Sequence, residues 1–289
     1  MQVTLAHVTH TYQPNSPFQA TAIRDVNMEI RPGEFLALIG HTGSGKSTLA
    51  QHINGLLKPT AGKVLLDGHD IHVKGFDKKT LRQKVGLVFQ YPEHQLFEET
   101  VAKDVAFGPK NLGLNEKEIA ERVEEALARV GLGQPGIAQK SPFELSGGQM
   151  RRAAMAGVLA MRPEILVLDE PAAGLDPQSR EDMLQLIAGL HRQGTTVVMS
   201  SHSMDDVARF ATRAVVMEHG TIAMEGAPEE IFRHAERLEQ MGLDVPSVCR
   251  LSLKLRAMGI DCPPDIFREE QAESALLALW KGGAAHGAE

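Results

Sequence analysis

The sequence is poor in the features that mark secreted and membrane-spanning chains. It has only two cysteines, Cys249 and Cys262, which excludes a disulfide-rich scaffold, fits a reducing compartment and matches no metal motif by spacing. Residues 1–30 lack a basic start followed by an apolar stretch, so no secretory signal is expected. No apolar run approaches the roughly 18–20 residues that span a bilayer. Any role at a membrane is therefore expected to work through a partner.

Basic residues are also fewer than acidic ones. The 30 Lys and Arg residues against 37 Asp and Glu residues give a net charge of -7, the opposite of the basic footprint of nucleic-acid binding. No nucleic-acid partner is expected. The length of 289 residues suggests about two domains, and 43% hydrophobic with 23% charged residues is typical of a globular protein.

Short apolar runs alternate with helical patterns along most of the chain. Runs at 34–39, 165–168 and 195–200 are predicted to be buried strands, whereas 46–53 and 182–190 are predicted helices. This alternation predicts an α/β class with a parallel sheet. Residues 95–163 are expected to be mostly helical, with Asn115 and Glu118 matching a capping box and a further helix from Gly147 to Met161.

The sequence changes character after about residue 227. A charged helix is expected over 228–240, and an amphipathic helix over 246–258. The second helix carries one apolar stripe: Val248, Leu251, Leu255 and Met258. A last helix is expected to end near Trp280, followed by a disordered Gly/Ala-rich tail over 281–289. We therefore divide the chain into 1–226 and 227–289, and we expect the second part to add contact in a dimer.

The most informative segment, GHTGSGKS, matches G-x-x-x-x-G-K-[ST] between a predicted strand and a predicted helix. Glycines let the backbone wrap an anion, and the following helix directs its positive end at phosphates. Lys46 is expected to reach the β- and γ-phosphates, and Ser47 to supply an oxygen to Mg²⁺. We expect this loop and the next residue to bind nucleotide: Gly40, His41, Thr42, Gly43, Ser44, Gly45, Lys46, Ser47 and Thr48.

Two more motifs carry chemistry. Asp169 ends a predicted strand and could hold Mg²⁺, while the adjacent Glu170 could orient or deprotonate an attacking water. The string LSGGQ opens a predicted helix with a serine and two glycines, which makes a second anion-binding helix N-terminus. Its expected nucleotide contacts are Ser146, Gly147, Gly148 and Gln149.

Together with Gln90 and His202, these motifs occur in the order found in ABC-transporter ATPases, which the chain resembles over about residues 3–226. The resemblance implies a P-loop NTPase fold with a RecA-like parallel-sheet core, an antiparallel β subdomain and a helical subdomain at about 92–163. A small C-terminal helical unit would follow. The resemblance also implies that ATP is held between two subunits, one supplying the phosphate loop and the other LSGGQ.

The resemblance suggests roles for single positions. Glu170 would be the general base, Gln90 would lie near the attacking water, and His202 would hold the γ-phosphate; these three are the expected catalytic residues. Tyr12 would stack on adenine, and Asp176 would lie at the dimer seam. The expected Mg²⁺ ligands are Ser47, Gln90 and Asp169.

The segment 90–109, QYPEHQLFEETVAKDVAFGP, resembles the ATPases of energy-coupling factor (ECF) importers, most of all the second, A-prime type. In that group two ATPases pair with a transmembrane T subunit at the cytoplasmic face of the cell membrane. Substrate-binding S subunits dock on it and take up vitamins or transition-metal ions. Residues 93–99 are expected to line the groove for a T-subunit helix. Ala172 departs from the hydroxyl residue more usual there, at a position without a catalytic role.

Alternative functions account for part of the sequence. A homodimeric ATPase of a dedicated cobalt or nickel importer stays open, because only the subgroup resemblance favours a heterodimer. A non-transport ABC ATPase of DNA repair or translation usually carries a coiled coil, a zinc module or tandem ATPase units, for which this chain has no room. A P-loop kinase for a small molecule would leave LSGGQ unexplained. The sequence therefore favours an ATP-hydrolysing subunit of an importer.

Overall fold

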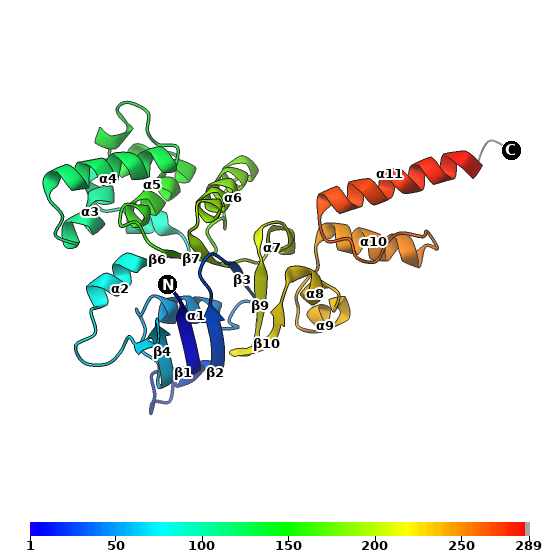
Figure 1. Ribbon diagram of the computed structural model, residues 1–289, viewed down its shortest axis with the longest axis horizontal. Helices are drawn as coiled ribbons and strands as arrows, with labels where there is room; N and C mark the ends of the chain where they lie inside the picture. Colours follow the sequence, from blue (N-terminus) through cyan, green and yellow to red (C-terminus); the bar gives the residue numbers. More distant parts are fainter. Residues whose placement is uncertain (287–289) are drawn as a thin grey trace.

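The computed structural model describes residues 1–286. Its strands form two sheets (Figure 1). One has the order β2-β1-β4-β5 and is antiparallel; the other has the order β10-β9-β3-β8-β7-β6 and is parallel except for β10. The strands are β1 (Val3–Tyr12), β2 (Ala20–Ile30), β3 (Phe35–Ile39), β4 (Ala61–Leu66), β5 (His69–Asp70), β6 (Val85–Val88), β7 (Ile165–Asp169), β8 (Thr196–Ser200), β9 (Arg213–Glu218) and β10 (Thr221–Gly226).

Helices follow most strands of the parallel sheet, which confirms the predicted α/β class. The helices before residue 160 are α1 (Lys46–Ile53), α2 (Lys78–Lys84), α3 (Val101–Asn111), α4 (Glu116–Arg129) and α5 (Gly147–Leu159), with 3-10 turns η1 (Pro92–Gln95), η2 (Ile137–Gln139) and η3 (Pro142–Glu144). The later helices are α6 (Pro177–Arg192), α7 (Met204–Phe210), α8 (Pro228–Phe232), α9 (Ala235–Gln240), α10 (Ser247–Ala257) and α11 (Glu269–His286).

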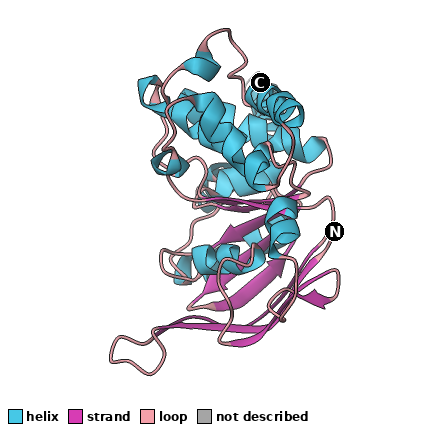
Figure 2. Cartoon of the chain, turned by 90° about the vertical axis from the view of Figure 1, so that its left-hand side faces the viewer, coloured by secondary structure: helices cyan, strands magenta, loops and turns pink. Residues whose placement is uncertain are grey.

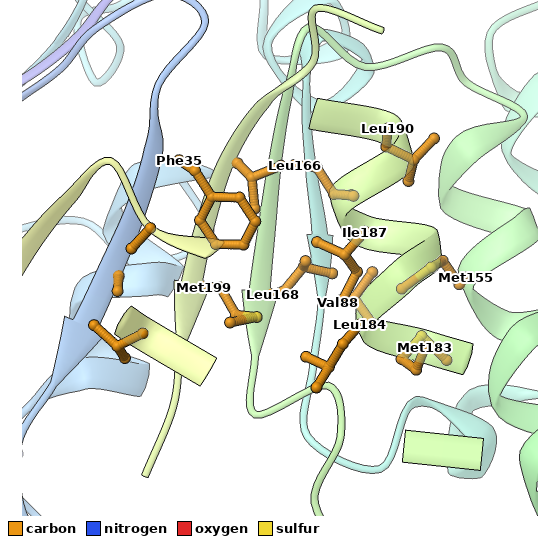
Figure 3. Packing of buried hydrophobic residues seen from close by; sticks show 14 of the residues in the cluster. Phe35, Val88, Met155, Leu166, Leu168, Met183, Leu184, Ile187, Leu190 and Met199 are labelled. Atoms are coloured by element: carbon orange, nitrogen blue, oxygen red, sulfur yellow. The ribbon is translucent and has the colours of Figure 1, made fainter. Parts of the chain in front are cut away.

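The central strands are buried on both faces of the parallel sheet, since every residue of β3, β7 and β8 is buried. Side chains alternate between the faces of a strand. Leu36 and Leu38 therefore join a core that includes residues of α1, whereas Phe35 and Ala37 join a core with α5 and α6. Figure 3 shows Phe35 and, from α6, Ile187 in this second core. Helix α1 and the pair α5–α6 thus cover opposite faces of the sheet.

Helices α3, α4 and α5 pack on one another, and Figure 2 shows most of the helices gathered in the upper half of the view, with strands and a few further helices below them. The predicted capping box of α4 is present: Asn115 accepts from the Glu118 N–H, and the Glu118 carboxylate accepts from the Asn115 N–H. Helix α5 begins at Gly147, as predicted. Caps and periodicity therefore placed this layer from local sequence alone.

Two helix predictions need correction. Helix α6 begins at Pro177 rather than Asp182, because Asp176 accepts from the Ser179 N–H (3.0 Å) and Pro177 occupies the first helical position. The segment 228–240 forms two short helices, α8 and α9, instead of one. The chain turns between them and buries Phe232 against the core of α5 and α6. The helix is interrupted at Arg233 and His234, where His234 leaves helical backbone angles (φ -95°, ψ 45°).

The C-terminal helices α10 and α11 extend away from the sheets in Figure 1. The predicted stripe is divided: Val248 and Leu255 pack against a small core around Cys262, whereas Leu251 and Met258 are exposed. Helix α11 continues to His286, past the end expected near Trp280, and residues 287–289 of the tail predicted to be disordered lie outside the described part. Among residues 1–286, no helix combines the length and apolarity needed to cross a membrane.

Candidate functional site

The glycine-rich loop lies between β3 and α1, where the sequence placed it. Gly40, Gly43 and Gly45 all have positive φ, and a Cβ on Gly40 would come 2.4 Å from the Met217 carbonyl oxygen. A residue with a side chain would be strained at these three positions, and at Gly40 it would also clash. Gly45 is the N-cap of α1, and no side chain caps this helix. The first N–H groups of α1 are thus left for an anion.

Lys46 lies folded into this loop. Its Nζ donates to the carbonyl oxygens of Gly40 (2.7 Å) and His41 (3.1 Å), and the side chain is buried. Burial lowers the pKa of Lys46, while the carboxylates of Glu170 and Asp169 oppose that shift. Ser44 has a buried hydroxyl with no hydrogen-bond partner. Polar groups therefore converge on the space that the loop encloses.

Asp169 ends β7, the strand that pairs with β8, and Glu170 follows it directly. Ser200, the last residue of β8, donates to Asp169 Oδ1 (2.6 Å) and accepts from the Glu170 N–H (2.9 Å). Glu170 has a φ of 49°, in the left-handed region, and this backbone bond holds it there. Sequence reasoning missed Ser200. The available signal was its place at the carboxyl end of a parallel strand neighbouring β7.

The three expected catalytic residues meet in the structure. Gln90 Nε2 donates to Glu170 Oε2 (3.2 Å), and His202 Nε2 lies 2.5 Å from Glu170 Oε1. Gln90 follows β6 and His202 follows β8, so the carboxyl ends of three strands bring them together. His202 is about half exposed, with 46% of its side chain accessible, and Glu170 is mostly covered. A carboxylate held from both sides beside a phosphate loop can position a water.

Tyr12, the expected adenine contact, lies at the end of β1. Its hydroxyl lies 3.2 Å from the Thr48 hydroxyl in α1, and its ring meets the His10 ring edge-on with centroids 4.6 Å apart. The Tyr12 side chain remains partly exposed. Two contacts thus fix the ring beside the helix that carries the phosphate loop.

The LSGGQ segment lies elsewhere. Ser146 is the N-cap of α5, and it forms a capping box with Gln149. A Cβ on Gly148 would come 2.9 Å from Ser179 Oγ, so this turn packs closely on the start of α6, which Asp176 caps. Helices α1 and α5 cover opposite faces of the sheet, and among the described residues no hydrogen bond joins LSGGQ to the phosphate loop.

A second residue that sequence reasoning left without a role is Arg151. It lies in the second turn of α5, is almost fully buried, and bonds both to Glu93 and to the turn that follows Glu170. Its partners are far from it in the sequence, so no local pattern could have identified them.

Comparison with known proteins agrees with this arrangement. A family profile described as ABC transporter matches residues 23–173. The chain is 52% identical over 285 residues to the energy-coupling factor transporter ATP-binding protein EcfA2 of Clostridium tetani, covering 98% of this chain and 99% of the relative. It is also 52% identical over 282 residues to the EcfA2 protein of Symbiobacterium thermophilum, with 98% of each covered.

Solved structures agree as well. The chain is similar to cbiO1 of Clostridium perfringens, described as part of the ABC transporter complex cbiONQ, with a TM-score of 0.72 and 35% identity over 89% of this chain and 96% of that one. It is also similar to the ATP-binding cassette MJ0796, a dimer bound to ADP and Pi. There the TM-score is 0.70 with 33% identity, over 78% of this chain and 98% of the other.

Proposed function

The chain belongs to the ABC transporter family, among the energy-coupling factor ATP-binding proteins, and we propose that it powers uptake of a vitamin or a transition-metal ion. It is an ATP-hydrolysing subunit that works with a transmembrane component and another ATPase subunit. Its place in this proposal is the cytoplasmic face of the cell membrane. The observation that carries the proposal is the Gln90–Glu170–His202 contact beside the phosphate loop.

In this proposal the phosphate loop binds ATP through its own backbone. The free N–H groups at the start of α1 meet the phosphates, and Lys46 exchanges its bonds to Gly40 and His41 for phosphate oxygens. Tyr12 stacks on the adenine ring from the position that Thr48 and His10 fix.

Hydrolysis is assigned to the residues at the carboxyl ends of the strands. Glu170 accepts a proton from the water that attacks the γ-phosphate, Gln90 orients that water, and His202 holds the γ-phosphate. The oxygen donors of Ser47, Gln90 and Asp169 are the ligand class that Mg²⁺ prefers, so these residues fit that ion. When bound, Mg²⁺ would neutralise charge on the β- and γ-phosphate oxygens.

A second ATPase subunit completes each site. The LSGGQ end of α5 and the phosphate loop belong to helices that cover opposite faces of the sheet, and none of the hydrogen bonds of the described residues joins the two segments. Ser146, Gly147, Gly148 and Gln149 therefore contact the ATP of the partner, with Asp176 at the seam. Two bound ATP molecules close the pair, and hydrolysis opens it, because each nucleotide favours the closed state only while both subunits bind it.

The transmembrane partner, a T subunit carrying S subunits, docks in a cavity of about 670 Å³ between α2, α3 and α5. The cavity wall includes Phe97 and Phe107, both exposed, with ring centroids 5.1 Å apart and edge-on. Gln95 and Leu96, also in the wall, belong to the segment 93–99 expected to line this groove. An apolar helix face fits this lining.

The region 227–289 is assigned to subunit association. Several exposed apolar side chains lie on α10 and α11 and in the link between them: Leu251, Leu253, Met258, Ile260, Leu276, Leu277 and Trp280. Exposed apolar side chains in such number mark an interaction surface. The double substitution Leu251→Glu with Trp280→Glu should weaken recovery of the second ATPase. Unchanged recovery would contradict this assignment.

The importer proposal is tested by purifying the tagged chain from its native membrane in gentle detergent and identifying the co-purifying proteins by mass spectrometry. A second ABC ATPase, a multi-span protein and several small membrane proteins would support the shared module. One membrane partner with only copies of this chain would favour a homodimeric cobalt or nickel importer. Recovery of no membrane protein would overturn transport in favour of a soluble ABC ATPase.

The groove itself is tested with matched variants. Phe107→Glu should remove the membrane protein from the purified material, because a charge would have to be buried under the docked helix. Phe18→Glu, at an exposed phenylalanine outside the cavity, is the control and should leave it bound. Equal recovery with both variants would place the docking surface elsewhere.

A further inference from the structure

Arg151 is a buried arginine that the proposed reaction does not use. Its side chain is 3% exposed. Its Nε and one terminal nitrogen donate to the Glu93 carboxylate at 3.0 and 2.6 Å. The other terminal nitrogen donates to the carbonyl oxygens of Pro171 (3.3 Å) and Ala173 (2.5 Å). One guanidinium therefore joins two loops that are far apart in the sequence.

Both loops carry an expected catalytic residue. Glu93 lies in η1, three positions after Gln90, and Pro171 directly follows Glu170. The residue between Gln90 and η1 is Tyr91, which has a φ of 55° and a ring whose centroid lies 5.6 Å from the Arg151 guanidinium carbon. The Tyr91 ring also lies close to Gly174, where a Cβ would come 3.4 Å from it. The strained backbone beside Gln90 is thus held against the turn that follows Glu170.

The charge state of the pair agrees with a permanent link. Burial is the largest single influence and would raise the pKa of Glu93, but the hydrogen bonding and charge of Arg151, a backbone hydrogen bond and the charge of His94 together lower that pKa. The guanidinium itself stays charged at any working pH. Its planar fork meets one carboxylate and two carbonyl oxygens at once, which a lysine ammonium on a flexible stem does not reproduce.

We propose that Arg151 is a positioning residue for ATP hydrolysis: it holds the loop after Gln90 and the turn after Glu170 in one register, so that the two side chains meet. This role rests on the proposed function of Glu170 as the general base. It also gives the membrane partner a route to that carboxylate. Gln95 of η1 and Ala154 of α5 both line the docking cavity, and these are the two elements that Arg151 connects.

The chain offers a matched control in Arg213. It is also buried and charge-paired, with Glu34 and Glu225, and it donates to the main-chain oxygen of Glu29. Arg213 and Glu34 lie at the starts of β9 and β3, at the amino ends of the parallel strands, whereas the candidate site lies at their carboxyl ends. Loss of a buried arginine network alone should affect both positions alike.

The experiment measures kcat and KM for ATP in the purified complex, together with the thermal midpoint, for Arg151→Lys, Glu93→Gln and Arg213→Lys. A small displacement of catalytic groups costs up to about 100-fold in rate. We expect Arg151→Lys to lower kcat at least about 10-fold with KM within about twofold of wild type. Glu93→Gln should lower kcat less, and adding it to Arg151→Lys should have little further effect. Arg213→Lys should lower the midpoint and leave kcat unchanged.

A normal kcat in Arg151→Lys, or an equal loss of kcat in Arg213→Lys, would overturn the positioning role. Glu170→Gln is measured in parallel. If that variant still hydrolyses ATP at the wild-type rate, Glu170 is not the general base, and the positioning role of Arg151 is overturned as well. If Glu170→Gln is inactive and Arg151→Lys is normal, only the positioning role is overturned.

Discussion

Two helices of this chain begin in glycine-rich turns, and they are prepared for an anion in different ways. Helix α1 follows the phosphate loop, has no side-chain cap and begins with the buried Lys46. Helix α5 begins in LSGGQ and is already capped by its own Ser146 and Gln149. The first turn offers free N–H groups and a positive charge, whereas the second offers the Ser146 hydroxyl and one closely packed glycine, Gly148.

This difference separates two tasks: the α1 end binds ATP, and the α5 end completes the site that binds ATP on another chain. The α1 end contains what is needed to hold a triphosphate by itself, with the proposed hydrolytic residues next to it. The α5 end is suited to add contacts to a nucleotide that another chain already holds. Variants of the two ends should therefore differ in kind: the first should affect ATP affinity, and the second should affect turnover only.

The largest effect is expected for Lys46→Ala. It removes the buried ammonium and leaves the Gly40 and His41 carbonyl oxygens without their donor. Affinity for a fluorescent ATP analogue should fall about 100-fold, which corresponds to about 3 kcal/mol, and turnover should disappear. Lys84→Ala, which removes an exposed lysine paired with Glu164, is the control. Tight binding by Lys46→Ala would show that the backbone alone holds the phosphates.

The next largest effect is a loss of ATP turnover with no change in ATP affinity. Glu170→Gln keeps the shape of the side chain but removes the proton acceptor, so hydrolysis should fall by about 10² to 10⁴ while ATP affinity stays the same. Glu164→Gln is a fitting control, because Glu164 and Glu170 flank opposite ends of β7. Phosphate release and analogue titration measure the two quantities. Weaker ATP binding by Glu170→Gln would mean that this carboxylate acts on the bound nucleotide itself.

A smaller effect is expected at the α5 end. Ser146→Ala removes one hydroxyl contact to a charged phosphate, which should lower turnover of the complex about 10-fold. It also removes the cap of α5, at about 1 kcal/mol of stability. ATP binding by the isolated chain should not change. Asn115→Ala, which removes the side-chain cap of α4, is the matched control. A loss of affinity in the isolated chain would contradict the separation of the two ends.

The smallest expected effect is on the pH dependence of stability, and it comes from a residue of α1 itself. His52 is fully buried near the end of this helix, and burial lowers its pKa from 6.5 to about 4, with His10 and His72 adding to the shift. The unfolded chain therefore takes up a proton at higher pH than the folded chain does. The free energy of unfolding should fall by about 1 kcal/mol between pH 7.5 and pH 5.5 from this group. Urea denaturation of His52→Gln should show a flatter pH dependence; an equal slope would contradict it.

Local chemistry decided how far the sequence could predict this structure. The glycine-rich loop, the Asn115 capping box and the start of α5 follow from neighbouring residues, and each was placed correctly. The start of α6 had a local signal as well, in the pair Asp176–Pro177. Apolar periodicity begins only later in that helix, so the prediction began too late.

The contacts that complete the site have no local signal. Ser200 bonds to Asp169 because β7 and β8 are neighbours in the sheet. Arg151 bonds to Glu93 across 58 positions of sequence. Such contacts depend on how helices and strands pack, and periodicity carries no information about that packing. The chemistry-bearing residues could thus be named from the sequence, but the residues that hold them could not.

The placement of α1 and α5 on opposite faces of the sheet also has a genetic consequence. If each ATP takes its loop from one subunit and its LSGGQ from the other, a defect at Lys46 and a defect at Gly148 of the same chain fall on different sites. Together they leave neither site whole. A Lys46 defect here, combined with an LSGGQ defect in the partner, falls on one site and spares the other. Two lesions in separate genes should thus be milder than the same two in one.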